Sequence, residues 1–142
     1  YDNVYEPTMI ASSGCAADCE ALKRVIRSDV RKSTQLGQIS SFATSDQVAS
    51  LLSSTLYSRR AFPFYSFCCV AGLQGVYVYD AVGSFEKVAV ASGGTGRESL
   101  QPILDRKSSK GQKDEYLLLN LNRYFKDPFA LQCRTAAVLI AL

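Results

Sequence analysis

The stretch from residue 51 to 73, LLSSTLYSRRAFPFYSFCCVAGL, constrains the fold more than any other part of this sequence. Before its arginines, apolar residues recur every three or four positions, which predicts an amphipathic helix that begins near the TSDQ segment at 44–47. Thr44 and Gln47 have the spacing of a capping box. Pro63 forbids continuation of the helix because its ring clashes with the preceding turn. The aromatic and small apolar residues that follow predict a strand buried on both faces. The expected stripe of the helix comprises Val48, Leu51, Leu52, Thr55, Leu56 and Arg59.

Similar patterns predict the remaining elements. The first half of the chain should contain a short strand at Thr8–Ser12, a helix over 15–32 and a polar connection over 33–43. After the central strand we expect a hairpin with strands Val76–Tyr79 and Phe85–Ala91, and then a third helix from residue 97 that is shortened or kinked by Pro102. A fourth helix over 114–133 and a last strand within 134–142 complete the prediction. Helices that alternate with a strand group predict a layered α/β sandwich, and the strand meander argues against a parallel doubly wound sheet. We predict one domain spanning residues 1–142.

Composition excludes several classes of function. The chain has 142 residues, 47% apolar and 20% charged, which is typical of a globular domain. Its net charge of +3 is too small to indicate nucleic-acid binding, and no 18-residue apolar run predicts a membrane span. Basic residues do gather in the first helix, at Lys23, Arg24, Arg27, Arg31 and Lys32, where we interpret them as a solvated helix face.

Histidine and cysteine restrict the chemistry further. The sequence contains no histidine, so it cannot form a Ser-His-Asp or Cys-His nucleophile of its own. It has five cysteines and no CxxC motif, which argues against a zinc site, and we expect no metal or cofactor. We interpret the cysteines as buried thiols in a reducing compartment. Cys68 and Cys69 should point to opposite faces of a strand, whereas Cys15 and Cys19 could share a helix face.

Three short motifs allow a functional and a plain structural interpretation. SGGTG at 92–96 could hold a phosphate or form a tight turn before a helix. SSGCAADCE at 12–20 could offer backbone N–H groups as an oxyanion hole, or be a simple turn. YSRR at 57–60 could bind an anion or complement the C-terminus of a helix. We favour core packing for the aromatic residues Phe64, Tyr65, Phe67, Tyr77, Tyr79 and Phe85.

Longer stretches carry a family resemblance. LLSSTLYSRRAFPFYSFCCVAGL and GVYVYDAVGSFEKVAVASGGTGRESLQPILD, together with IASSGCAADCEALKRVI, closely resemble β-type subunits of the eukaryotic 20S proteasome core, most of all the non-catalytic sixth β-type subunit. The resemblance is strong over residues 5–107 and weaker through LNLNR, FKDPF and the last strand. It implies a four-layer αββα sandwich of the N-terminal-nucleophile hydrolase type. It also implies assembly with other α- and β-type subunits in stacked seven-membered rings, in the cytoplasm and nucleus, without nucleic acid, membrane or cofactor.

The same resemblance bears on catalysis. Active members of the family use an N-terminal threonine as nucleophile, assisted by its own amine and a nearby lysine, but this chain begins at Tyr1 without the preceding strands. Gly14 matches the oxyanion glycine of active relatives, and Thr95 stands where they have a serine. Their Asp-x-x-Ser loop before the last strand has no counterpart, because QCRTAAV runs straight through. We therefore interpret Gly14 and Thr95 as vestigial scaffold, since a hydroxyl without a base is not activated.

The resemblance thus favours a structural, non-catalytic ring subunit that supports ubiquitin-dependent protein degradation by neighbouring threonine proteases. Tyr57, Arg59, Arg60 and Phe62 are the candidate interface or structure-defining residues. Two alternatives stay open: a catalytic subunit whose nucleophile segment lies outside these 142 residues, and a free-standing ligand-binding module that uses the SGGTG turn. Shortfalls at both termini and at loops suggest that the sequence joins pieces of a longer chain.

Overall fold

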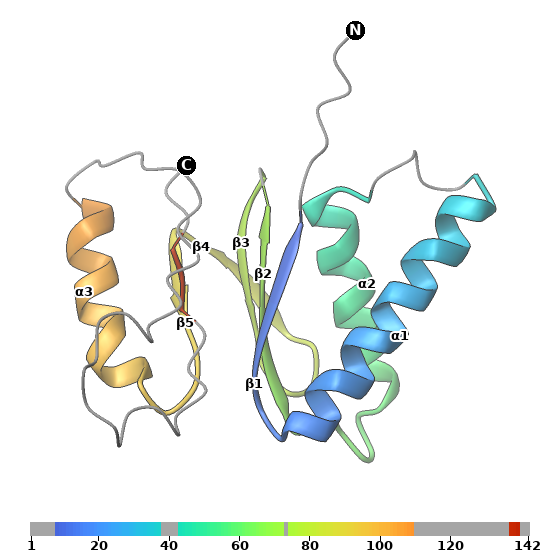
Figure 1. Cartoon of the computed structure of the whole chain (residues 1–142), viewed down its shortest axis with the longest axis horizontal. Coiled ribbons are helices and arrows are strands. Elements are labelled where there is room, and N and C mark those ends of the chain that lie inside the picture. Colours follow the sequence, from blue (N-terminus) through green and yellow to red (C-terminus); the bar gives the residue numbers. More distant parts are fainter. Residues whose placement is uncertain (1–7, 38–42, 73, 110–136, 140–142) are drawn as a thin grey trace, which may run out of the picture.

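The computed structural model describes residues 8–37, 43–72, 74–109 and 137–139, and these form four layers (Figure 1). Helices α1 and α2 cover one face of a four-stranded sheet, a two-stranded sheet lies on the other side, and α3 covers that second sheet. The elements are β1 (Met9–Gly14), α1 (Ala16–Gln35), α2 (Ser45–Ser58), β2 (Ser66–Gly72), β3 (Gly75–Tyr79), β4 (Phe85–Val88), β5 (Val90–Ser92), α3 (Arg97–Ser109) and β6 (Ala137–Leu139). The predicted α/β sandwich with helices on both outer sides is confirmed.

Helix α1 buries a narrow apolar stripe. Cys19, Leu22 and Ile26 are buried, whereas Val25 is exposed. The helix continues to Gln35, three residues beyond the predicted end at 32. Within this extension, the Thr34 hydroxyl donates to the carbonyl of Val30 at 2.9 Å, so polar residues that we assigned to a loop still fit the helix.

Helix α2 begins at the predicted capping box. The Thr44 hydroxyl accepts from the N–H of Gln47 at 3.4 Å, and the Gln47 side chain accepts from the N–H of Thr44 at 3.0 Å. The helix buries Val48, Leu52 and Leu56 against the sheet, as the stripe predicted. Arg59 was wrongly included in that stripe, because α2 ends at Ser58 and Arg59 is exposed at its C-cap.

The four-stranded sheet is antiparallel in the order β1-β2-β3-β4. Register pairs Ser12 with Cys68 and Cys69 with Val78. Side chains of alternate residues in β2 therefore enter two separate cores: Cys68 packs below α1 and α2, and Cys69 packs on the opposite face. The prediction that these two cysteines point to opposite faces is confirmed.

The predicted strand Phe85–Ala91 is wrong as a single element. Its first part, β4, pairs with β3 in the large sheet, while β5 pairs with β6 in the small sheet. The chain leaves one layer and enters the other at Ala89, between these strands. Continuous β propensity cannot reveal such a crossing, because both halves have the same extended backbone.

Helix α3 packs on the small sheet through Leu100 and Leu104, which contact Val90. Pro102 lies inside α3 without ending it, so the predicted shortening of this helix at the proline is wrong. The missing N–H of the proline costs the helix one hydrogen bond. None of the helices in the described ranges is long and apolar enough to cross a membrane. The predicted fourth helix and Cys133 lie outside the described residues.

Aromatic residues divide between core and surface. Phe64, Tyr77 and Tyr79 are buried, as predicted. Tyr65, Phe67 and Phe85 are exposed by 64%, 46% and 42%, so core packing was the wrong interpretation for these three. Tyr65 and Phe67 point away from α1 and α2 because they alternate with Ser66 and Cys68 along the strand.

Candidate functional site

A cavity of about 660 Å³ opens between the large sheet and the turn that leads into α3. Its wall is formed by the end of β1, the beginning of β2, part of β3 and the Gly-rich turn. The lining residues are Ala11, Ser12, Ser13, Gly14, Tyr65, Phe67, Cys68, Cys69, Val78, Tyr79, Ser92, Gly93, Gly94, Thr95 and Arg97. Gly14 and Thr95, the two site residues predicted from the sequence, thus reach the same cavity from opposite sheets.

Gly14 is held at the cavity edge by a tight backbone arrangement. Its φ of +125° favours glycine, and a Cβ at this position would overlap the carbonyl oxygen of Tyr65. The next N–H, that of Cys15, donates to the same Tyr65 oxygen at 2.9 Å. This N–H is therefore occupied and is not free to act as an oxyanion donor.

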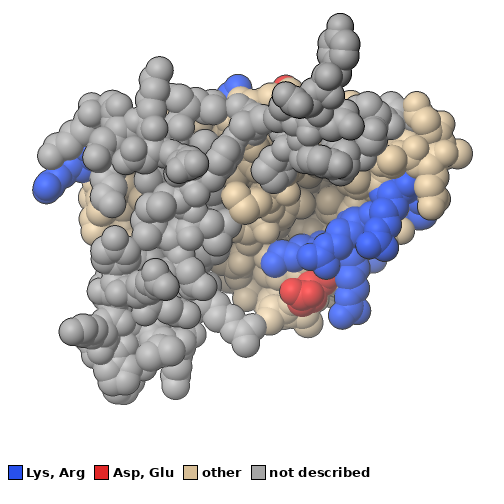
Figure 2. Space-filling model, turned by 45° about the horizontal axis from the view of Figure 1, so that its top comes forward, with Lys and Arg blue, Asp and Glu red and all other residues tan. Residues whose placement is uncertain are grey.

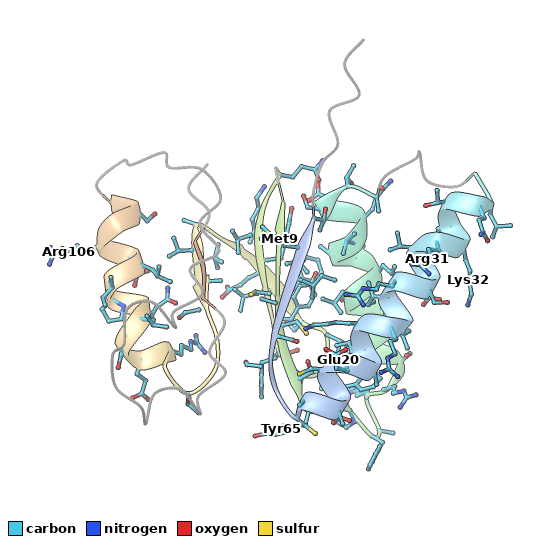
Figure 3. The ribbon with its side chains drawn as sticks, viewed as in Figure 1. Met9, Glu20, Arg31, Lys32, Tyr65 and Arg106 are labelled. Atoms are coloured by element: carbon cyan, nitrogen blue, oxygen red, sulfur yellow. The ribbon has the colours of Figure 1, made fainter. Side chains whose placement is uncertain are left out.

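The N-terminus of α1 completes this arrangement. Asp18 accepts from the N–H of Tyr65 at 2.9 Å, so both backbone groups of Tyr65 bind the segment that begins α1. Figure 3 shows Tyr65 at the end of the sheet where β1 turns into α1. Cys15 is the exposed N-cap of α1, whereas Cys19 is buried, so these two cysteines do not share a face as we had suggested.

Thr95 lies in the turn between β5 and α3. Gly94 has a φ of +91°, and its carbonyl accepts from the N–H of Arg97 at 3.2 Å. Ser92 anchors the turn to the helix, because its buried hydroxyl donates to Gln101 at 2.6 Å and Gln101 donates to Asp105 at 3.0 Å. The turn is thus a compact connection whose Thr95 side chain is exposed.

Burial keeps the lining thiols protonated. It raises the pKa of Cys69 to about 11, and it also raises the pKa of Cys68, an effect that the hydrogen bond from Ser66 partly offsets. Burial likewise raises the pKa of the Tyr79 phenol, whose hydroxyl donates to the carbonyl of Ala49 at 2.6 Å. These groups are poor nucleophiles at neutral pH, since the thiolate is the reactive form.

Among the described lining residues, Arg97 carries the one full charge, and no lysine, carboxylate or histidine lines the cavity. A guanidinium does not accept a proton at neutral pH. The described residues also contain no cluster of three or more potential metal ligands. The arrangement can hold a polypeptide segment or a small ligand against backbone and aromatic groups, but these residues provide no general base.

Comparison with known proteins identifies the family. The family model for proteasome subunits matches residues 3–122. The chain belongs to the proteasome subunit family. Its four layers are accordingly those of the N-terminal-nucleophile hydrolase sandwich.

The similar relatives are β-type proteasome subunits. Proteasome subunit beta type-1 of Petunia hybrida is 40% identical over 102 residues, which cover 68% of this chain and 45% of the relative. The beta type-1 subunit of Dictyostelium discoideum is 35% identical over 118 residues, covering 78% and 49%. A "Probable proteasome subunit beta type-6" of Encephalitozoon cuniculi is 49% identical over 61 residues, covering 40% and 21%. The chain spans about half the length of the first two relatives.

The interface residues predicted for this β-type proteasome subunit lie away from the cavity, at the C-terminal end of α2 and in the residues that follow it. The Arg59 guanidinium lies 4.6 Å from the centre of the Phe64 ring, and Arg60 donates to the Tyr57 hydroxyl at 3.2 Å. Arg59 and Arg60 therefore have packing roles inside the chain. Phe62 is 83% exposed and contributes little to the fold, which makes it the most suitable of the four for contact with another subunit.

Sequence reasoning missed several residues that line the cavity of this proteasome subunit. Ser13, Ser92 and Arg97 flank the two predicted positions and share the same cavity. Each lies within three residues of Gly14 or Thr95 along the chain, so proximity to the motifs was a usable signal. Tyr65 and Phe67 gave no such signal. Alternation along a strand shows that neighbouring side chains lie on opposite faces, but it does not show which face packs against helices and which lines a cavity.

Proposed function

We propose that this chain is a structural, non-catalytic β-ring subunit of the 20S proteasome core, most like the sixth β-type subunit. It would contribute wall and interfaces to the particle, while neighbouring threonine-protease subunits cleave the peptides. One observation carries the proposal: the described lining of the cavity between the sheets contains no group that could deprotonate a hydroxyl nucleophile. The names of the relatives divide between beta type-1 and beta type-6, so the subunit type is part of the proposal.

Exposed aromatic residues support the proposal that this chain contacts other subunits. Tyr57, Phe62 and Tyr65 are each more than half exposed. Large apolar side chains of this kind are typical of protein interfaces, where aromatic residues are enriched. Stacked rings of α- and β-type subunits would cover such side chains, and we place the particle in the cytoplasm and nucleus.

The test uses the native particle. The chain is tagged in its own cells, the particle is purified, and its subunits are identified by mass spectrometry. The particle is then treated with a covalent electrophile that reacts with N-terminal threonines. We expect this chain to co-purify with α- and β-type relatives and to remain unlabelled, while some of its neighbours are labelled.

Two outcomes would contradict the proposal. Labelling of this chain, with a threonine at its mature N-terminus, would make it a catalytic subunit. Recovery of the chain as a monomer would exclude the ring subunit and would direct attention to the SGGTG turn as a ligand site.

A further inference from the structure

Helix α1 carries positive charge on its exposed side. It contains five lysine and arginine residues and three acidic residues. Figure 2 shows Lys and Arg side chains as a continuous band along α1, with a small acidic patch beside it.

Three arginines form the centre of the band. Arg24, Arg27 and Arg31 are exposed, and because they are three and four residues apart they lie along one side of the helix. We call them the arginine stripe. At a rise of about 1.5 Å per residue, the stripe is about 10 Å long, or two turns of helix. It is separate from the buried stripe of Cys19, Leu22 and Ile26 that faces the sheet.

No carboxylate of α1 lies within ion-pair distance of the arginine stripe. Within α1, Lys32 forms an ion pair with Asp29 at 3.4 Å. Asp18 accepts from the backbone of Tyr65 instead. Glu20 is exposed one turn before Arg24, at the opposite end of the helix from Arg31 and Lys32 (Figure 3). The three guanidinium groups therefore lie more than 4 Å from any described carboxylate.

Arginine rather than lysine at all three positions indicates recognition of a planar anion. A guanidinium is less strongly hydrated than an ammonium group, and its fork of N–H donors matches the two oxygens of a carboxylate. A nucleic acid would need a longer basic surface, and the whole chain has a net charge of only +3. A short acidic protein segment fits two helical turns.

We propose that the arginine stripe binds a carboxylate-rich segment of a neighbouring subunit in the assembled particle, such as a helix with acidic residues at matching spacing. This inference rests on the proposed function, because it requires a neighbour. It adds the chemistry of one interface: the partner surface is acidic, and its contact with α1 weakens as salt concentration rises.

The experiment compares two triple variants, one that removes the positive charge and one that keeps it without the guanidinium group. In one, Arg24, Arg27 and Arg31 are replaced by Gln, and in the other the same three residues are replaced by Lys. Gln, Lys and Arg have similar helix propensities, so α1 should form in both. Each tagged variant is expressed in cells, and its incorporation into the purified particle is measured across a range of NaCl concentrations.

We expect the Gln variant to be retained about five- to tenfold less than the wild-type chain at moderate salt. The Lys variant should be retained to a degree between these two, because an ammonium group keeps the charge but lacks the guanidinium fork. The Lys variant also supplies amines that a zero-length carbodiimide cross-linker joins to adjacent carboxylates. Mass spectrometry should then find cross-links from positions 24, 27 and 31 to Asp or Glu residues of another subunit.

Equal retention of all three chains at every salt concentration, with cross-links only to this chain's own carboxylates, would overturn the inference and leave a solvated helix face. Release by nuclease treatment would indicate a nucleic-acid partner and would also overturn it. A wild-type chain found outside any large particle would refute the proposed function itself, and this result is distinct from the other two.

Discussion

Gly14 joins three elements through a single backbone position. It ends β1, pairs with Ser66 in β2 and precedes the N-cap of α1. Its positive φ and its close approach to the Tyr65 carbonyl leave no room for a side chain. The geometry at the cavity edge therefore depends on glycine, whether or not the site performs chemistry.

We expect Gly14→Ala to destabilise the chain by about 3 kcal/mol, because it combines an unfavourable φ with a steric overlap. Gly37→Ala is the matched control: Gly37 has a φ of +67° with nothing within 4 Å of an added Cβ, so about 1 kcal/mol of backbone strain is expected. Urea denaturation followed by circular dichroism measures both. Equal losses would show that the Tyr65 contact does not restrict position 14.

Cys69 gives a prediction for alkaline pH. Burial raises its pKa to about 11 in the folded chain, from 9.0. Between these values the unfolded chain loses a proton that the folded chain keeps, so the stabilising effect is complete below pH 9 and declines as pH rises toward 11. The expected loss from this group is of the order of 1 kcal/mol per pH unit.

Denaturation curves between pH 8 and 10.5 measure this decline. Cys69→Ala should make the decline shallower, whereas Ser54→Ala, which removes no titratable group and lies on the exposed side of α2, should leave it unchanged. An unaltered slope in Cys69→Ala would assign the alkaline loss to other groups.

At the scale of the element, α2 shows how local sequence sets both ends of a helix. The reciprocal hydrogen bonds of Thr44 and Gln47 define its beginning, and the peptide N–H of Arg59 bonds back to Leu56 at its end. Asp46 accepts a hydrogen bond from the Tyr77 hydroxyl, which joins the first turn of α2 to β3. The first turn of α2 therefore contributes both to the start of the helix and to its position on the sheet.

Removal of the cap should have a moderate cost. We expect Thr44→Ala to lower the free energy of unfolding by about 1 kcal/mol, because the N–H of Gln47 loses its partner. Ser54→Ala, on the exposed side of the same helix, should change stability by less than about 0.5 kcal/mol. The two melting temperatures make the comparison, and a Thr44→Ala protein as stable as Ser54→Ala would mean that water replaces the cap without cost.

At the scale of the whole molecule, two apolar cores share one sheet. One lies under α1 and α2, and the other lies between the large sheet and β5. The segment after α2 belongs to neither core except through Phe64, which is buried beside Arg59. Its exposed residues can therefore change without opening a cavity in the fold.

We expect the double variant Arg59→Ala plus Arg60→Ala to impair assembly of the particle without altering the active sites of other subunits. Both arginines pack on aromatic rings of this chain, so part of the effect should come from the local fold. Phe62→Ala separates the two causes, because its side chain is 83% exposed and should affect assembly alone. Native gel analysis of particles from cells makes the measurement, and normal assembly of both variants would exclude this segment from an interface.

Short-range patterns in the sequence were enough to predict several of the local elements. The capping box at Thr44, the end of α2 before Pro63, and the opposite orientations of Cys68 and Cys69 all follow from short-range stereochemistry, and the structure confirms them. The family resemblance likewise depended on contiguous residues, and Gly14 and Thr95 came from it.

Other features of this protein depend on its tertiary structure, because short-range patterns do not specify how the layers pack together. The crossing between sheets at Ala89, the exposure of Tyr65 and Phe67, and the meeting of Gly14 with Thr95 at one cavity depend on how layers stack. Strand propensity and alternation are the same whichever face is covered, so residues distant in sequence settle these features through packing.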